Sequence, residues 1–356
     1  MSRVATFLEL AVKQGGSDLH LVSGQTPRIR INGVLEPVRF RELSTGDLEL
    51  LLAEIITPEQ RERLDARLSV DFAYEVPGLG RFRVNAYRHT HGLAAALRVV
   101  PDVVESLDRL GLPPVVREMV RQPKGLILVT GPTGSGKSTT LAAIVDHVNR
   151  TRRGHIITIE DPIEFVHDYR SCVVTQREIG THAPTFADAL RDAVREDPDV
   201  VLVGEMRDLE TISLALTAAE TGIQVLGTLH TNGAVRCVDR IVNVFPAGRQ
   251  DQVRTMLADS LRLVISQQLV RLADGTGRRL AAEVLVNTPA SAAMIRGGHT
   301  HRLTTVIQSG GRAGMQLLDS VLMDLLRQDL ISGEDAHEHA VEKAQFERYL
   351  GLDPAA

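Results

Sequence analysis

The sequence predicts an α/β protein of two unequal parts, a small α+β unit followed by a larger unit built on a mainly parallel, doubly wound sheet. Short strands joined by tight turns fill the first hundred residues, and beyond a Pro- and Gly-containing segment the strands alternate with helices. The length of 356 residues suits about two domains. We expect an N-terminal domain at 1–100, a linker at 101–114 and a second domain at 115–356.

The elements of the first unit follow from its local patterns. The alternation over 28–31 meets Asn32-Gly33 and resumes at Val34, which is a strong hairpin signal. Ser44 or Thr45 is placed to cap a helix, and Pro58 suits the first turn of another. We expect a helix within 1–16, strands at 18–22, 28–31 and 34–35, helices at 46–56 and from 58, and strands at 81–87 and 93–100.

The second unit shows a regular alternation of apolar strands and amphipathic helices. Residues 125–130 form a continuous apolar run, as expected of a strand that is buried on both faces. We expect strands at 125–130, 155–159, 200–203 and 224–227, helices at 137–149, 186–194 and 209–219, and mostly helices after about 285. This order predicts that the strands are mainly parallel.

Composition excludes several classes of protein. Lys and Arg total 40 and Asp and Glu 45, so the net charge is −5, and aromatic residues make up only 3%. Nucleic-acid binders usually carry a basic excess and aromatic stacking residues. Two cysteines, Cys172 and Cys237, cannot form a disulfide scaffold or a cysteine zinc cluster. No apolar run is long enough to span a membrane. We therefore expect a cytoplasmic protein with at most peripheral membrane association.

A phosphate-binding loop is predicted at 131–138, which reads GPTGSGKS. Its glycines let backbone N–H groups face the phosphates, and the following helix adds its positive end. Lys137 is expected to reach the β- and γ-phosphates and Ser138 to bind Mg²⁺. The expected nucleotide-binding residues are Gly131, Pro132, Thr133, Gly134, Ser135, Gly136, Lys137, Ser138 and Thr139.

Acidic and histidine side chains follow the neighbouring predicted strands. Glu205 comes shortly after an apolar strand, where it is placed to hold the Mg²⁺ shell and to orient water. Asp161 and Glu164 follow the strand at 155–159, and His230 follows the strand that begins at 224. Ligands bind at the carboxyl ends of strands in such sheets, so we expect these groups to lie on one edge.

The phosphate-binding loop, the carboxylates after the strand at 155–159, the segment ending at Glu205 and the segment ending at His230 form four clusters along the chain. Their order resembles the signatures of the secretion-ATPase superfamily, which serves type II secretion and type IV pili. They match its Walker A motif, its aspartate box (160–164), its Walker B motif (ending at Glu205) and its histidine box (about 221–230). Within the superfamily the chain resembles the pilus retraction ATPases over almost its full length. Further similar segments are 15–21, 204–212, 227–231, 294–299 and 314–316.

The resemblance implies a PAS-like N-terminal domain, a RecA-like ATPase domain with a helical C-terminal region, and a homohexamer that binds ATP and Mg²⁺ between the domains. It assigns Glu205, Glu164 and His230 to catalysis, and Ser138, Glu205 and Asp161 to the Mg²⁺ shell, partly through water. Arg83 and Arg98 match a pair of arginines that face the phosphates. The implied partners are an inner-membrane platform protein, which would place the ATPase peripherally at the inner membrane, and a second retraction ATPase.

Two departures from the family pattern stand out. Ile223 replaces the first histidine of the histidine box, which puts a two-histidine sensor in doubt. His299 ends the retraction motif in place of lysine, which removes a charge near pH 7. Neither change touches Lys137 or Glu205, so we expect hydrolysis to be retained.

The sequence therefore favours an ATPase motor that retracts pili and thereby depolymerises pilin. Accessory retraction ATPases are an alternative within this class. Assembly and type II secretion ATPases are disfavoured because they usually carry four zinc-binding cysteines and extra N-terminal domains. A nucleic-acid translocase is disfavoured by charge, and a regulatory module without turnover is disfavoured by intact Lys137, Glu164 and Glu205. A small GTPase would need an Asn-Lys-x-Asp motif, which the sequence lacks.

Overall fold

The computed structural model describes residues 2–31, 33–100 and 104–351. They form two compact units, one made up of the residues before 104 together with 162–166, and one comprising residues 104–161 and 167 onward. Three parts of the expected organisation lie outside the described residues: Asn32 of the predicted turn, the first three positions of the predicted linker, and the last five residues of the chain.

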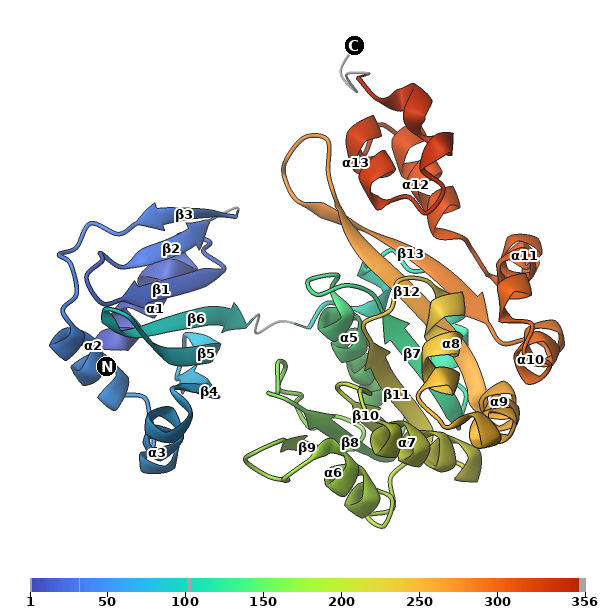
Figure 1. The fold of residues 1–356 in the computed structure, drawn as a ribbon, viewed down its shortest axis with the longest axis horizontal. Helices are drawn as coiled ribbons and strands as arrows, with labels where there is room; N and C mark the ends of the chain where they lie inside the picture. The colour runs from blue at the N-terminus through green and yellow to red at the C-terminus, as the bar shows by residue number, and fades with distance from the viewer. Residues whose placement is uncertain (1, 32, 101–103, 352–356) are drawn as a thin grey trace. The chain divides into compact units, whose positions relative to one another are not determined.

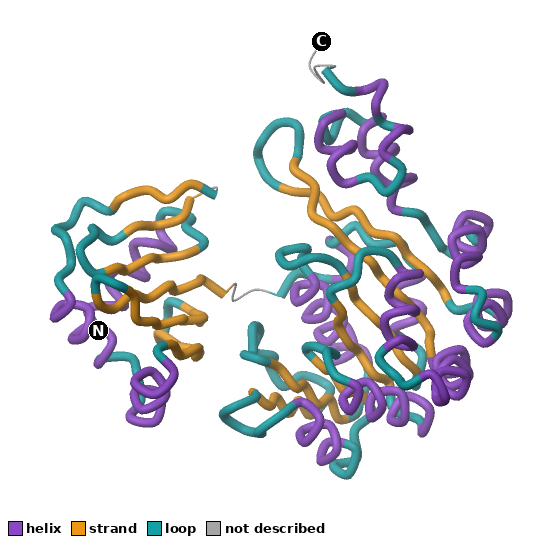
Figure 2. The backbone as a smooth tube through the Cα atoms, viewed as in Figure 1, coloured by secondary structure: helices purple, strands orange, loops and turns teal. Residues whose placement is uncertain are grey.

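The first unit is a six-stranded antiparallel sheet with three helices (Figures 1 and 2). The strand order is β3-β2-β1-β6-β5-β4. Its elements are α1 (Arg3–Lys13), β1 (Asp18–Val22), β2 (Arg28–Ile31), β3 (Val34–Pro37), α2 (Thr45–Ala53), α3 (Pro58–Arg67), β4 (Ser69–Val76), β5 (Gly80–His89) and β6 (Gly92–Val100). The predicted hairpin is confirmed as β2 and β3, while β4 had not been predicted.

Local chemistry explains where these helices begin. Ser44 and Thr57 cap α2 and α3, and each forms a capping box with the side chain three residues later. In β4, Val70 and Phe72 point into the core while Ser69 and Asp71 stay exposed, so the period of two was present in the sequence. Burial of this apolar face stabilises the sheet.

The second unit is built on a seven-stranded sheet of order β13-β12-β7-β11-β10-β8-β9. Every neighbouring pair is parallel except β12 and β13, so the predicted α/β class is confirmed. Its strands are β7 (Gly125–Thr130), β8 (His155–Glu160), β9 (Val173–Glu178), β10 (Val200–Val203), β11 (Gln224–Leu229), β12 (Leu261–Arg271) and β13 (Arg278–Val286).

Helices alternate with these strands along the sequence and pack against the sheet. They are α4 (Val115–Val120), α5 (Lys137–Thr151), α6 (Phe186–Ala193), α7 (Leu209–Thr221), α8 (Ala234–Asn243) and α9 (Ala247–Ser260). All residues of β7, β10 and β11 are buried, which is why their apolar runs are continuous. The predicted linker contains a 3₁₀ turn, η1 (Leu107–Arg109), whose Leu107 is buried in this core.

The C-terminal region follows the long hairpin of β12 and β13 (Figure 1). It comprises α10 (Pro289–Arg296), α11 (Leu303–Ser309), α12 (Leu318–Arg327) and α13 (Gly333–His339). α12 packs on β13 and α13 on β12, where Val270, Leu322 and Phe346 belong to a separate small core. The sequence predicted the helices but not the hairpin on which they pack.

Among the described residues, no helix has both the length and the apolar composition that crossing a membrane requires.

Candidate nucleotide site

The predicted functional clusters of the second unit meet at one edge of its sheet. Thr130, at the end of β7, lies opposite Leu229, and Val203 of β10 lies between Ile159 and Gly227 in register. The segments that follow these strands therefore leave the sheet on the same side. This edge is the carboxyl edge, where open parallel sheets bind ligands.

The phosphate-binding loop joins β7 to α5, as predicted. Gly131, Gly134 and Gly136 have positive φ values of 145°, 80° and 86°, a region that favours glycine. No residue within the described chain caps α5 by its side chain, so the start of this helix presents backbone N–H groups. Lys137 Nζ donates to the carbonyl oxygens of Gly131 (2.9 Å) and Pro132 (3.0 Å). The lysine thus lies across the loop it is predicted to serve.

A glutamine on β12 supports this loop from beneath. Gln267 is fully buried, and its Nε2 donates to the carbonyl oxygen of Ser135 at 2.8 Å. A Cβ at position 131 would overlap the carbonyl oxygen of Gln267, so only glycine lets the loop lie this close to β12. Gln267 was not predicted from the sequence. Its signal was a polar run, 266–268, between the apolar stretches 263–265 and 269–270.

Glu205 and His230 are in direct contact at the same edge. His230 Nε2 lies 2.9 Å from Glu205 Oε1, and Arg207 Nε donates to the same oxygen. This hydrogen bond raises the pKa of Arg207. The Glu205 side chain is 17% exposed, whereas that of Arg207 is 76% exposed. A carboxylate in contact with a histidine and with an exposed arginine is suited to orienting water beside a phosphate.

The carboxylates that follow β8 are less tightly grouped. Glu160 Oε1 accepts from Thr158 Oγ1 at 2.6 Å and from Gln176 Nε2 at 3.3 Å. Asp161 is exposed and Glu164 is half-buried in the loop that follows. Asp161 directly follows the carboxyl end of β8, whereas Glu164 belongs to residues 162–166, which group with the first unit, so its place at this edge stays a prediction.

The loop after β11, which carries His230, is anchored by three neighbouring strands. Thr130 Oγ1 donates to the carbonyl of Thr231 and lies 2.8 Å from its hydroxyl. Ser266 Oγ accepts from the N–H of Gly233 at 2.7 Å. Glu283 Oε1 accepts from the N–H of Ala234, also at 2.7 Å. Burial raises the pKa of Glu283, although the N–H groups of Ala234 and Leu318 oppose this shift.

Arg83 and Arg98 belong to the first unit, on β5 and β6. They are direct register partners, so their side chains leave the same face of the sheet. Arg98 Nε donates to Asp18 Oδ1 at 2.9 Å, yet its side chain remains 66% exposed. The two arginines therefore form an adjacent cationic pair.

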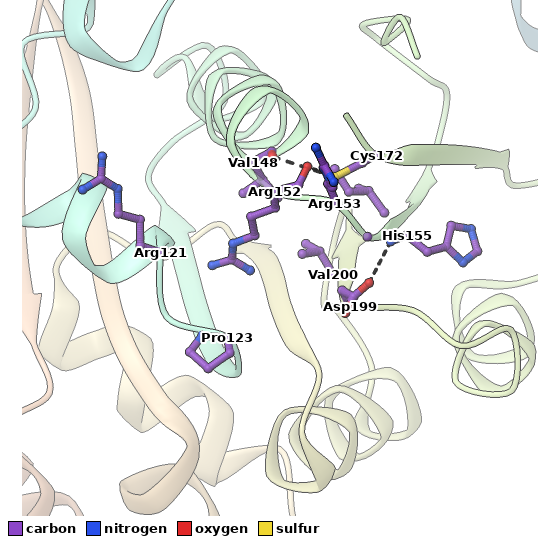
Figure 3. Close-up of a pocket in the computed structure, with 11 residues that line it drawn as sticks. Arg121, Pro123, Val148, Arg152, Arg153, His155, Cys172, Asp199 and Val200 are labelled. Carbon is purple, nitrogen blue, oxygen red and sulfur yellow. Dashed lines mark hydrogen bonds between the residues drawn. The ribbon is translucent and has the colours of Figure 1, made fainter. Parts of the chain in front are cut away.

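A cavity of about 190 Å³ lies at the opposite, amino edge of the second sheet (Figure 3). Its lining includes Arg152 at the end of α5, and His155 and Val200 at the starts of β8 and β10. Arg152 Nη2 donates to the carbonyl oxygens of Val120 (2.5 Å) and Gln122 (2.8 Å), and so holds the end of α4. This cavity is separate from the nucleotide site.

The two departures from the family motifs also lie away from the carboxyl edge. Ile223 precedes β11 and packs partly buried against the core, whereas His230 follows β11. The six residues of this strand separate them by roughly 20 Å. The segment 294–299 ends α10, where Arg296 pairs with Asp259 at 2.5 Å. α10 follows the end of β13, which lies at the amino edge because β13 runs antiparallel.

Comparison with known proteins agrees with this architecture. Residues 2–348 match the family model described as type II/IV secretion system protein. The chain is 48% identical over 337 residues to the type IV pilus retraction ATPase PilT of Pseudomonas aeruginosa, covering 95% of this chain and 98% of that protein. It is 39% identical to the type IV pilus ATPase PilU of the same organism, covering 94% and 87%. A crystal structure of the pilus retraction motor PilT with bound ADP superposes with a TM-score of 0.90 at 43% identity, covering 98% and 99%.

Proposed function

The chain belongs to the type II/IV secretion system protein family, and from this premise we propose that it is a hexameric ATPase motor that drives type IV pilus retraction. The observation that carries the proposal is the shared carboxyl edge, at which the phosphate-binding loop and the Glu205–His230 contact occur in a chain that is 48% identical to a retraction ATPase. ATP hydrolysis would supply the work for withdrawing pilin subunits.

The proposed chemistry follows from the residues at this edge. The N–H groups at the start of α5 and Lys137 bind the phosphates, so Lys137 gives up its bonds to Gly131 and Pro132 when nucleotide enters. Glu205 orients water, whose oxygen attacks the γ-phosphorus. The bond to the β–γ bridging oxygen breaks, leaving ADP and phosphate. His230 holds Glu205 and responds to loss of the γ-phosphate.

The described residues suit Mg²⁺ only in company with a nucleotide. Within the described chain no group of three or more His, Cys, Asp or Glu side chains is placed to hold a metal alone. Mg²⁺ usually takes one or two carboxylates together with phosphates and water. Ser138, Asp161 and Glu205 would hold it here, partly through water, and it would neutralise phosphate charge. Glu164 would assist at the same edge.

Arg83 and Arg98 are proposed to complete the site on the phosphate side. A guanidinium stays charged and makes forked contacts with phosphate oxygens. Their register pairing presents two such groups together. In the proposed ring, binding of ATP between the domains would change how they close on one another. We propose that an inner-membrane platform protein is the partner that receives this movement. The ATPase would lie in the cytoplasm and attach peripherally to the inner membrane. A second retraction ATPase would be a further partner.

Deletion of the gene in the source organism tests the proposal. Loss of twitching motility with more surface pili than wild type is the expected result, because pili would still be assembled but not withdrawn. Absence of surface pili would refute retraction and favour assembly. Normal retraction that fails only under load would favour an accessory ATPase. A Lys137→Ala copy should not complement the deletion, whereas a wild-type copy should.

A further inference from the structure

One buried carboxylate on β13 faces the starts of two helices that belong to different parts of the second unit. Glu283 Oε1 accepts from the N–H of Ala234, the first residue of α8, at 2.7 Å. The N–H of Leu318, the first residue of α12, also faces this carboxylate and opposes the rise of its pKa. The residues on either side of Glu283 hold the segment that leads into α12: the N–H of Val284 donates to the carbonyl oxygen of Gln316 at 2.9 Å, and Gln316 Nε2 donates to that of Ala282 at 2.8 Å. Neither helix is capped by the side chain of its own N-cap residue. Glu283 therefore caps α8 from outside that helix and lies beside the uncapped start of α12.

Each of these helices leads to a different functional region. α8 begins four residues after His230, and the loop between them is fixed by Thr130 and Ser266. α12 begins the small C-terminal core on the outer half of the β12–β13 hairpin. Ser266 and Glu283 are direct register partners, so both anchors of the His230 loop on this hairpin sit side by side.

From this geometry we infer that Glu283 is a positioning residue that couples the His230 loop to the C-terminal helices. A shift of the loop moves the start of α8, and the shared carboxylate transmits that shift to the start of α12. A buried carboxylate is expensive to leave unpaired, so moving both helix starts together costs less than releasing one N–H. The inference deepens the proposed ATPase function and rests on it.

The test compares Glu283→Gln with Asp319→Asn in the full-length chain. Glutamine keeps one oxygen acceptor but replaces the other with an NH₂ group and removes the negative charge, so it cannot face both helix starts with an acceptor. Asp319 is the matched control because it also lies in the first turn of α12, yet its carboxylate bonds to Val341 and Glu342 and not to α8. Both variants make the same carboxylate-to-amide change.

Hydrogen–deuterium exchange is measured with and without ADP and Mg²⁺. In wild type and in Asp319→Asn, we expect ADP to slow exchange at 131–139, 228–240 and 317–327. In Glu283→Gln, protection at 131–139 should remain and the ADP-dependent change at 317–327 should be lost. Equal ADP-dependent protection at 317–327 in both variants, or protection in wild type that stops short of 317–327, would overturn the inference. Absence of any ADP effect, including at 131–139, would instead refute the proposed function on which it rests.

Steady-state kinetics separates positioning from simple support of the fold. We expect Glu283→Gln to lower kcat about 5- to 30-fold, which is the change in rate equivalent to the free energy of a lost helix cap. The KM for ATP should stay within about twofold of wild type. In a His230→Ala background the same substitution should change kcat less than about twofold, because the loop it positions has lost its functional side chain. Full additivity of the two substitutions would contradict the coupling.

Discussion

Replacing Gln267 with leucine tests how the phosphate-binding loop is held. Gln267 Nε2 donates to the carbonyl oxygen of Ser135 at 2.8 Å, and Gln267 is fully buried. Leucine has a similar size but no hydrogen-bond donor. The carbonyl oxygen of Ser135 therefore loses its side-chain partner, and it can reach water only if the loop opens. A buried polar group without its partner costs about 1–3 kcal/mol. Because the loop must be closed on the phosphates to bind ADP, this free energy weakens the affinity for ADP about 5- to 150-fold.

The stability of the fold should change less than the affinity. Gln267 Oε1 has no protein hydrogen-bond partner within the described chain, and leucine removes this atom as well. The gain from removing one unpaired atom offsets part of the loss at Ser135. We therefore expect Tm to fall by no more than about 4 °C, since 1 kcal/mol shifts Tm by about 2–4 °C in a domain of this size.

Isothermal titration calorimetry with ADP and Mg²⁺ measures the affinity, and differential scanning calorimetry measures Tm. Gln268→Leu is the matched control, because Gln268 points to the other face of β12 and bonds to His339 of α13 at 2.6 Å. This variant should bind ADP as wild type does. Binding of ADP by Gln267→Leu within twofold of wild type would refute the idea that this amide shapes the loop.

Three further predictions concern the proposed catalytic residues and a half-buried histidine. Lys137→Ala and Glu205→Ala should each abolish ATPase activity while circular dichroism and Tm stay near wild type; turnover retained by either variant would contradict the motor. Arg98→Ala should lower kcat by at least about 10³-fold, as arginines facing transferred phosphates do, with only a small loss of Tm because the Arg98 side chain is 66% exposed and Asp18 keeps the hydrogen bond from Ser17 Oγ at 2.7 Å. Burial, followed by nearby arginines, lowers the pKa of His147 below its usual 6.5. The stability it contributes is therefore present above pH 6.5 and lost as pH falls through its folded pKa. His147→Gln should flatten the decline of Tm between pH 7.5 and 5, and an unchanged slope would contradict this.

Sequence reasoning succeeded where a local pattern and a chemical motif coincide. The phosphate-binding loop lies between an apolar strand and a helix, and both are found where they were expected. His230 and Glu205 were predicted to share an edge because both follow parallel strands, and they are in contact at 2.9 Å. In each case the constraint is carried by residues within a few positions of the motif.

The supporting residues were missed because their roles depend on distant pairing. Gln267 and Glu283 lie on β12 and β13, and nothing near them in sequence refers to the phosphate-binding loop or to α8. Only the parallel pairing of β12 with β7 brings Gln267 beneath the loop. Arg207 contacts Glu205 through a local turn, but the direction of a side chain in a turn does not follow from spacing alone.

The topology also resolves the doubt raised by Ile223. The fold places position 223 at the amino edge and His230 at the carboxyl edge, at opposite ends of β11. A side chain at 223 therefore cannot touch the same phosphate as His230. Ile223 instead packs against the apolar core, and the N–H of Gly125, the first residue of β7, donates to its carbonyl oxygen at 3.1 Å. An isoleucine in place of histidine at this half-buried position adds apolar contact with the core and leaves the contact between His230 and Glu205 intact.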